Sequence, residues 1–212
     1  MKWLRVPFEI LVPQGIDEGA VTGSAEHVAR TLAARKAEKV LEELRTHGQQ
    51  HWADGIVLGA DTVVATEHAA EQRLLGKPRN LEHARQMIVD LSGRSHRVVT
   101  GVAVARQGET TRAEVSVTEV RFRPLPEEDI GRYLQTGEYV GKAGAYGIQG
   151  KGRSLIAGIR GCYYNVVGLP LRLAARMIGE YLPHSFGHCD CGGDPLQLES
   201  VVDCDEAGRS TS

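Results

Sequence analysis

The sequence predicts an α/β fold, because stretches with helical periodicity alternate with short β-branched runs along the chain. Between residues 24 and 44, the apolar residues Val28, Leu32 and Val40 recur at multiples of four, which places them on one face of a helix. Residues 56–58 form an apolar run bounded by turn residues, as is typical of a buried strand. The 212 residues, 42% hydrophobic and 25% charged, have an ordinary globular composition, for which one domain is the default.

The first elements along the chain are predicted to be a short strand at residues 8–12 and the helix over residues 24–44. An acidic residue, Glu18, falls in the Gly-flanked loop between them, where it can ligate a metal ion or simply be solvated. Lys36 lies on the apolar stripe of the helix, where an apolar side chain would be expected. Its ammonium must reach a charged partner or snorkel to water, and snorkelling is the alternative to a functional role.

The next strand begins at Ile56 and is expected to end at Asp61. Ligands collect at the carboxyl ends of strands in open α/β sheets, so Asp61 is a candidate general base or magnesium ligand. The alternative is a turn aspartate that accepts hydrogen bonds from nearby backbone donors. Lys77 follows in a Gly-Lys-Pro turn, where it can bind an anion or serve as an ordinary surface lysine.

Helices and strands continue to alternate through the rest of the body of the chain. They are expected as a helix over residues 80–91, a hairpin of strands at 98–105 and 113–122, a helix from 126 to 137, strands at 155–159 and 163–167, and a last helix at about 170–182. Asn80 can cap the first of these helices, and Gly93 can stop it. Acidic residues follow Pro126, where the helix dipole favours them.

A glycine-rich loop at residues 141–152 is the strongest local sign of a ligand site. Its five glycines allow the backbone to approach a ligand closely. Lys142 suits a phosphate, and Gln149 suits the edge of a base; a flexible hairpin connection is the alternative. No Walker A pattern and no Gly-x-Gly-x-x-Gly that opens a helix occurs in the sequence, which disfavours the two commonest phosphate-binding folds.

Charge and hydropathy limit the classes of partner. The 25 basic and 27 acidic side chains give a formal net charge of −2, without the basic excess typical of nucleic-acid binding. No apolar run approaches the length of a membrane span, about 18 residues, and no signal-peptide pattern opens the chain. We therefore expect a cytoplasmic protein with neither nucleic acid nor membrane as a partner.

The last segment, residues 183–212, is acidic, rich in Gly and Ser, and without periodicity, so we expect it to be disordered. It holds His188, Cys189, Cys191 and Cys204. Zinc binding by these residues is disfavoured, because Cys189 and Cys191 are separated by one residue rather than by the usual two to four.

Several segments of the chain share one set of family motifs in the same order and spacing. They are residues 59–64, 75–79, 91–96 with 100–102, 142–150 and 164–170. Together they resemble the Maf family of nucleoside triphosphate pyrophosphatases, and define a Maf-like domain over residues 1–182. The Asp-Thr and Gly-Ile-Gln-Gly motifs are similar to those of the subfamily that hydrolyses dTTP and UTP. The resemblance implies an α/β, Maf/ITPase-like mixed twisted sheet with flanking helices and a nucleotide cleft between two lobes.

The resemblance also implies a reaction and a set of site residues. A nucleoside triphosphate is cleaved to the monophosphate and pyrophosphate with a divalent metal cation, Mg²⁺ or Mn²⁺, and a homodimer is left open. The implied roles are the catalytic base for Asp61, metal binding for Glu18 and Asp61, base selection for Thr62 and Gln149, and phosphate binding for Lys36, Lys77 and Lys142.

The family pattern begins with a strand and a Ser-x-Ser-x-Arg-Arg loop, which the sequence lacks before residues 6–10. We expect an active dTTP/UTP-type pyrophosphatase, because every later motif is intact. The alternative is a catalytically impaired nucleotide-binding or interaction protein of the same fold that affects cell division. A third hypothesis makes the segment after residue 182 a metal or partner module.

Overall fold

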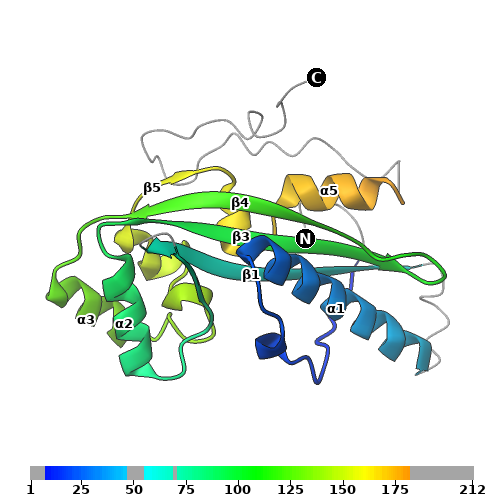
Figure 1. Ribbon diagram of the computed structural model, residues 1–212, viewed down its shortest axis with the longest axis horizontal. Helices are drawn as coiled ribbons and strands as arrows, with labels where there is room; N and C mark the ends of the chain where they lie inside the picture. The colour runs from blue at the N-terminus through cyan, green and yellow to red at the C-terminus, as the bar shows by residue number, and fades with distance from the viewer. Residues whose placement is uncertain (1–7, 47–54, 69–70, 182–212) are drawn as a thin grey trace. The chain divides into compact units, whose positions relative to one another are not determined.

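The chain folds into a sheet with helices packed against it (Figure 1), and the computed structural model describes residues 8–46, 55–68 and 71–181. The helices are α1 (Ala25–Thr46), α2 (Leu81–Leu91), α3 (Glu127–Gln135), α4 (Tyr163–Val167) and α5 (Leu171–Gly179). The strands are β1 (Ile56–His68), β2 (Glu71–Leu75), β3 (Ser95–Arg106), β4 (Arg112–Phe122) and β5 (Ile156–Arg160). Short 3₁₀ helices are η2 (Glu18–Ala20), η4 (Ala143–Ala145) and η5 (Gly150–Leu155). The predicted α/β fold class is confirmed.

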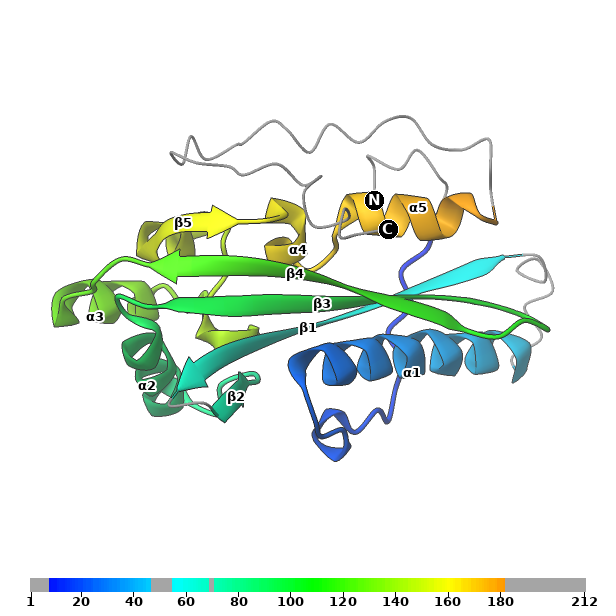
Figure 2. The ribbon, with the colours of Figure 1, turned by 45° about the horizontal axis from the view of Figure 1, so that its top comes forward.

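The five strands form one sheet in the order β2-β1-β3-β4-β5. β1 and β2 form an antiparallel hairpin whose register pairs Val64 with Leu75. β5 runs antiparallel to β4, and the register shifts between Arg121 and Phe122, as at a β-bulge. Figure 2 shows β3 and β4 as the long central hairpin that the sequence predicts. Among the described helices, none is long and apolar enough to cross a membrane.

The chain divides into two compact units, each built from segments that are not continuous in sequence. Of the described residues, the first unit contains those up to Asp61, then 100–116, then 168–181, and the second unit contains 62–99 and 117–167. β1, β3 and β4 each contribute residues to both units, so each unit takes its own portion of these three strands.

In the first unit, the sheet is covered by α1 on one face and by α5 on the other (Figure 2). Alternation along β3 produces both faces, since successive side chains of a strand point in opposite directions. Ala103 and Ala105 pack with Ala33 and Ala37 of α1. On the opposite face, Val102 and Val104 pack with Ala174, Met177 and Ile178 of α5.

Two glycines let α1 lie unusually close to the sheet. A Cβ atom added at Gly101 would lie 2.1 Å from the backbone oxygen of Ala29, and one added at Gly59 would lie 2.5 Å from that of Ala33. Both distances are shorter than any real Cβ contact. Glycine is therefore required at both positions, and the residues of α1 that face them are alanines.

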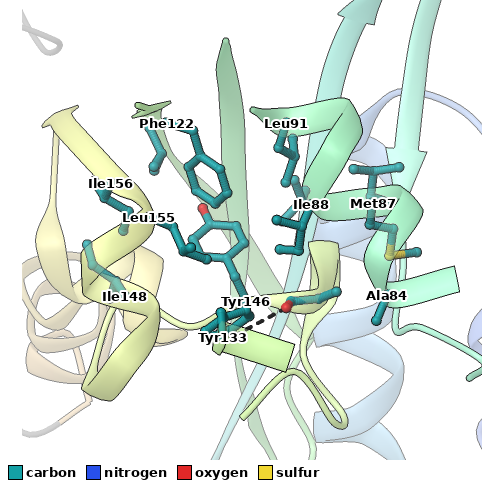
Figure 3. Close-up of a cluster of buried hydrophobic side chains, with 14 of the residues drawn as sticks. Ala84, Met87, Ile88, Leu91, Phe122, Tyr133, Tyr146, Ile148, Leu155 and Ile156 are labelled. Carbon is teal, nitrogen blue, oxygen red and sulfur yellow. Dashed lines mark hydrogen bonds between the residues drawn. The ribbon is translucent and has the colours of Figure 1, made fainter. Parts of the chain in front are cut away.

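The second unit has its own apolar core, formed by α2, α3, the 140s loop and the adjacent strand ends (Figure 3). One face of α2 contributes Ala84, Met87, Ile88 and Leu91. Tyr146 lies edge-on to Phe122 with ring centroids 4.8 Å apart, in the geometry that aromatic pairs prefer. Tyr133 donates a hydrogen bond of 3.3 Å to the backbone oxygen of Ala145, which fixes the loop to α3.

Two expectations about secondary structure are wrong, and one observed strand has no predicted counterpart. Residues 8–12 pair with no strand of the described sheet, and Ile10 is 81% exposed, because an apolar run becomes a strand only where a neighbour completes its hydrogen bonds. Residues 163–167 form the short helix α4 instead of a strand, since a short apolar run does not distinguish the two. β2 was not expected at all. The segment 183–212, with its cysteine and histidine candidates, lies outside the described residues.

Candidate active site

Asp61 lies in the interior of β1, which continues to His68, and not at the end of a strand as expected. The prediction is wrong because the polar Asp-Thr pair does not end the strand, and the β-branched residues after it extend the strand. The Asp61 side chain is only 10% exposed. Gly59 is two residues earlier, on the face of β1 that packs against α1, and this close approach brings the helix within reach of Asp61.

Lys36 of α1 is the partner of that carboxylate. Its Nζ donates a short hydrogen bond to Asp61 Oδ1 and a second one, 2.9 Å long, to Glu18 Oε1. Burial alone would lower the pKa of Lys36, but the hydrogen bonds and charges of Asp61 and Glu18 outweigh burial and raise it above its ordinary value. The ammonium is therefore firmly protonated, and the polar interruption of the apolar stripe is explained by two partners and not by snorkelling.

Glu18 reaches the same ammonium from the segment before α1. It is the first residue of η2, where Asp17 caps the turn by accepting a hydrogen bond of 2.9 Å from the Gly19 amide. The cap holds the backbone of the turn, and the Glu18 side chain, 39% exposed, points to Lys36. Three segments far apart in the sequence thus supply one cluster of two carboxylates and one ammonium.

The two carboxylates also fit a divalent cation. Glu18 Oε1 and Asp61 Oδ1 converge on a single cationic atom, so their oxygens are already oriented toward one point. Among the described residues, no group of three or more His, Cys, Asp or Glu side chains could hold a metal. Two carboxylates are nevertheless enough for Mg²⁺, which typically takes one or two protein carboxylates together with water and substrate phosphates.

The other four predicted site residues belong to the second unit. Thr62 follows Asp61 in β1 and is partly buried, whereas Lys77, Lys142 and Gln149 are exposed. Exposure suits residues that would contact a ligand, and it equally suits the alternatives of a surface lysine or a polar loop residue.

A backbone hydrogen bond joins the Lys77 turn to the glycine-rich loop. The Gly144 amide donates to the Gly76 oxygen at 3.0 Å, so the residue before Lys77 is tied to the loop that carries Lys142. Gly144 has φ +68°, and a Cβ there would lie 3.1 Å from Val64 of β1. The loop is therefore not a flexible connection but is packed on β1 and held to the Lys77 turn.

Sequence reasoning missed two buried polar groups that organise the second unit. Asn165 of α4 is fully buried, and its Nδ2 donates to the Val98 oxygen at 2.9 Å and to Thr118 Oγ1 at 3.0 Å. His96 is 2% exposed, and its Nε2 lies 2.7 Å from the Tyr146 hydroxyl. The sequence does contain an indication of the role of Asn165, because an amide side chain within an apolar run must find buried hydrogen-bond partners.

Comparison with known proteins gives consistent results across the body of the chain. The family model described as Maf-like protein matches residues 1–181. A dTTP/UTP pyrophosphatase of Symbiobacterium thermophilum is 43% identical over 182 residues, which cover 85% of this chain and 87% of that protein. Proteins of the same name from Carboxydothermus hydrogenoformans and Thermococcus kodakarensis are 41% and 45% identical, over 85% and 78% of this chain and 91% and 81% of their own lengths.

Proposed function

The chain belongs to the Maf family. From that premise we propose that it hydrolyses dTTP and UTP to the nucleoside monophosphate and pyrophosphate. One observation carries the proposal: Asp61 and Glu18 converge on Lys36 in a chain 43% identical to a protein named dTTP/UTP pyrophosphatase. The cluster provides the groups that the chemistry needs, and the similarity points to the substrate. A cytoplasmic location belongs to the same proposal.

The reaction is a displacement by water at the α-phosphorus. Asp61 accepts a proton from the attacking water, whose oxygen forms a bond to the α-phosphorus. The bond from that phosphorus to the oxygen bridging to the β-phosphate breaks, and pyrophosphate leaves with the electron pair. In phosphoryl transfer, catalysis is mainly positioning and stabilisation of charge on the phosphate oxygens.

The remaining residues have roles that follow from this chemistry and from family membership. Lys36, Lys77 and Lys142 meet the phosphates as cations. Thr62 and Gln149 select the pyrimidine base by hydrogen bonds, since a site that hydrogen-bonds its substrate penalises an analogue that leaves those groups unpaired. The tie between the Gly76 oxygen and the Gly144 amide supports a joint role for the lysines that flank it.

Mg²⁺ or Mn²⁺ is the proposed cofactor, and Glu18 and Asp61 are the residues that would hold it. When bound, such a cation supplies positive charge to the phosphate oxygens. Water and substrate phosphate would complete its ligands, because Mg²⁺ retains several waters in proteins.

The proposal is tested by measuring pyrophosphate release from dTTP and UTP, beside purine triphosphates, with Mg²⁺ or Mn²⁺. We expect the pyrimidine nucleotides to be cleaved to monophosphates. Asp61→Asn should lower kcat by about 10² to 10⁴-fold, the usual contribution of a positioned general base.

Asp90→Asn is the matched control. Asp90 is a partly exposed carboxylate of α2 that pairs with Arg73 at 3.3 Å, and its loss should leave kcat unchanged. Release of inorganic phosphate with a diphosphate product would contradict the proposal. Nucleotide binding without turnover would favour the catalytically impaired binding protein, and full activity of Asp61→Asn would refute the assignment of the base.

A further inference from the structure

Lys36 occupies the point on which both proposed metal ligands converge. Its Nζ is 2.9 Å from Glu18 Oε1 and still closer to Asp61 Oδ1. A Mg²⁺ ion would need oxygens at about 2.0–2.1 Å, so the ammonium and a divalent cation cannot both occupy the point between these two oxygens. Their charges also repel each other at any such separation.

We propose that Lys36 is the resident cation of this carboxylate pair, and that Glu18 and Asp61 take a divalent cation only after the Lys36 ammonium has left them. The inference rests on the proposed function, which assigns the two carboxylates as metal ligands. It adds that Lys36 has two alternating partners: the carboxylates in the free protein, and the substrate phosphates once the divalent cation is bound.

The environment of Lys36 supports such an exchange. Two carboxylates brought together without a cation repel each other, and the ammonium between them offsets part of that repulsion in the free protein. The Lys36 side chain is 23% exposed, so it has a path to solvent and to a ligand. Its ammonium is a compact charge on a flexible four-carbon stem, which can change partners while α1 stays in place.

A permanent salt bridge is the competing interpretation. Under that interpretation Asp61 stays bound to Lys36 throughout, and its oxygen is less available as a base or a metal ligand. Exchange removes this conflict, because departure of Lys36 frees Asp61 at the moment when phosphates offer the ammonium a new anion. Lys36 thereby couples occupancy of the carboxylates to the presence of nucleotide.

The test measures binding of MnCl₂ alone, without nucleotide, from the loss of the paramagnetic resonance signal of free Mn²⁺. Lys36→Met removes the competing ammonium and should bind Mn²⁺ about tenfold more tightly than the wild type, since a unit charge at this distance is only partly screened. Asp61→Asn combined with Lys36→Met should lose that gain.

Lys39→Met is the matched control, because Lys39 lies one turn away on α1 and pairs with Glu42 at 3.2 Å. It removes the same charge from the same helix but touches neither proposed ligand, so its Mn²⁺ affinity should equal that of the wild type. Equal affinities for Lys36→Met and Lys39→Met would overturn the proposal.

A second measurement needs no variant, and it tests the exchange of Lys36 even if Lys36→Met fails to fold. Acetylation of the wild type by acetic anhydride is quantified at Lys36 and Lys39 by mass spectrometry, with and without saturating MnCl₂. Release from two carboxylates should raise the labelling of Lys36 relative to Lys39, and an unchanged ratio would refute the exchange. Neither measurement involves turnover, so the exchange can fail while pyrophosphate release from dTTP still supports the proposed function, and the reverse also holds.

Discussion

His96 illustrates how burial determines the charge state of a single residue. Its ring lies edge-on to Phe122 and Tyr146, with centroids 5.1 and 5.4 Å away. Burial lowers the pKa of His96 to about 4, and the opposing charge of Glu119 only partly offsets this. Nδ1 has no hydrogen-bond partner in the described part of the chain. His96 is therefore a neutral core residue at physiological pH, and it is hydrogen-bonded to Tyr146.

We predict that His96 makes the protein less stable as the pH falls from about 6.5 to 4. The unfolded chain binds a proton near pH 6.5, whereas the folded state resists protonation until about pH 4. More protons are bound in the unfolded state across this window, so stability falls with falling pH. Between pH 7 and 4.5 this contribution is about 2 kcal/mol, measurable by urea unfolding at the two pH values.

His96→Gln isolates the effect, because glutamine can still bond to Tyr146 but does not titrate. The variant should lose less stability than the wild type over the same pH interval. If both chains lose the same amount, other groups account for the acid sensitivity.

At this scale, the sequence showed that Lys36 needs a partner but did not show which residues supply it. Lys36 was identified because an ammonium on an apolar stripe requires a partner. Its partners, Glu18 and Asp61, lie 18 and 25 residues away in the chain, and no local pattern reports such contacts. The bond between His96 and Tyr146 spans 50 residues and was invisible for the same reason.

Among the elements, the packing of α1 on β1 and β3 controls the geometry of the cluster. The helix lies close to the sheet because the strands present glycine and α1 presents alanine at the contact. This spacing sets how far the Lys36 side chain must reach to Asp61. Small residues at this interface thus determine the geometry of the proposed chemistry.

We predict that Gly101→Ala destabilises the protein and also impairs the cluster. The new Cβ would meet the backbone oxygen of Ala29 at 2.1 Å, and backbone cannot rotate away as a flexible side chain can. Overpacking typically costs about 1–3 kcal/mol, and a contact this short with backbone places the expected cost at the upper end of that range. Displacement of α1 by about 1 Å should reduce kcat by about 10²-fold, even though residue 101 lies outside the cluster. Denaturant unfolding and the pyrophosphate assay measure the two effects.

Gly131→Ala in α3 is the matched control, because a Cβ there meets nothing within 4 Å. Alanine is favoured over glycine within a helix, so this variant should be more stable by about 0.5–1 kcal/mol, with unchanged kcat. Stability unchanged in Gly101→Ala would mean that α1 yields easily, which would refute the role given to the close contact.

Periodicity predicted the elements that are long and clearly patterned. The helix over residues 24–44 is confirmed as α1, and the central hairpin is confirmed as β3 and β4. The wrong predictions concern segments of only five residues, which are too short for periodicity to distinguish a helix from a strand. The predicted strand at residues 163–167 is the helix α4, whose turned backbone lets Asn165 reach Val98 and Thr118. A single glycine inside an apolar strand, such as Gly59, indicates close approach of another backbone.

For the molecule as a whole, the apolar cores and the proposed cation site are distinct. The cores consist of aliphatic and aromatic side chains, and Lys36 already pairs with both carboxylates of the cluster. The described residues offer no cluster of three metal-ligating side chains. Because the cores are apolar and contain no metal ligand, we expect the described residues to fold without a bound metal.

We predict that EDTA abolishes pyrophosphate release while leaving the Tm within about 2 °C of its original value, below the shift expected from 1 kcal/mol. Added MgCl₂ should restore turnover. Cooperative unfolding on addition of EDTA, as in proteins whose folding depends on a structural metal, would contradict this expectation.

For the whole molecule, the sequence predicted the fold class but not which segments form each of the two compact units. The α/β class and the family followed from motifs spread over the body of the chain. The division into two units does not follow sequence order, because β1, β3 and β4 each supply both. Such sharing depends on tertiary contacts, which periodicity along one dimension does not encode.

The interior position of Asp61 in β1 has a consequence for timescales. Residues on both sides of it continue the strand, so the carboxylate cannot approach or retreat by loop closure. Movement of this carboxylate is then left to its own side chain, because the strand backbone on both sides of it is fixed. The exchange at Asp61 would thus need no lid or domain motion, which takes microseconds or longer, and it would leave the backbone of β1 unchanged.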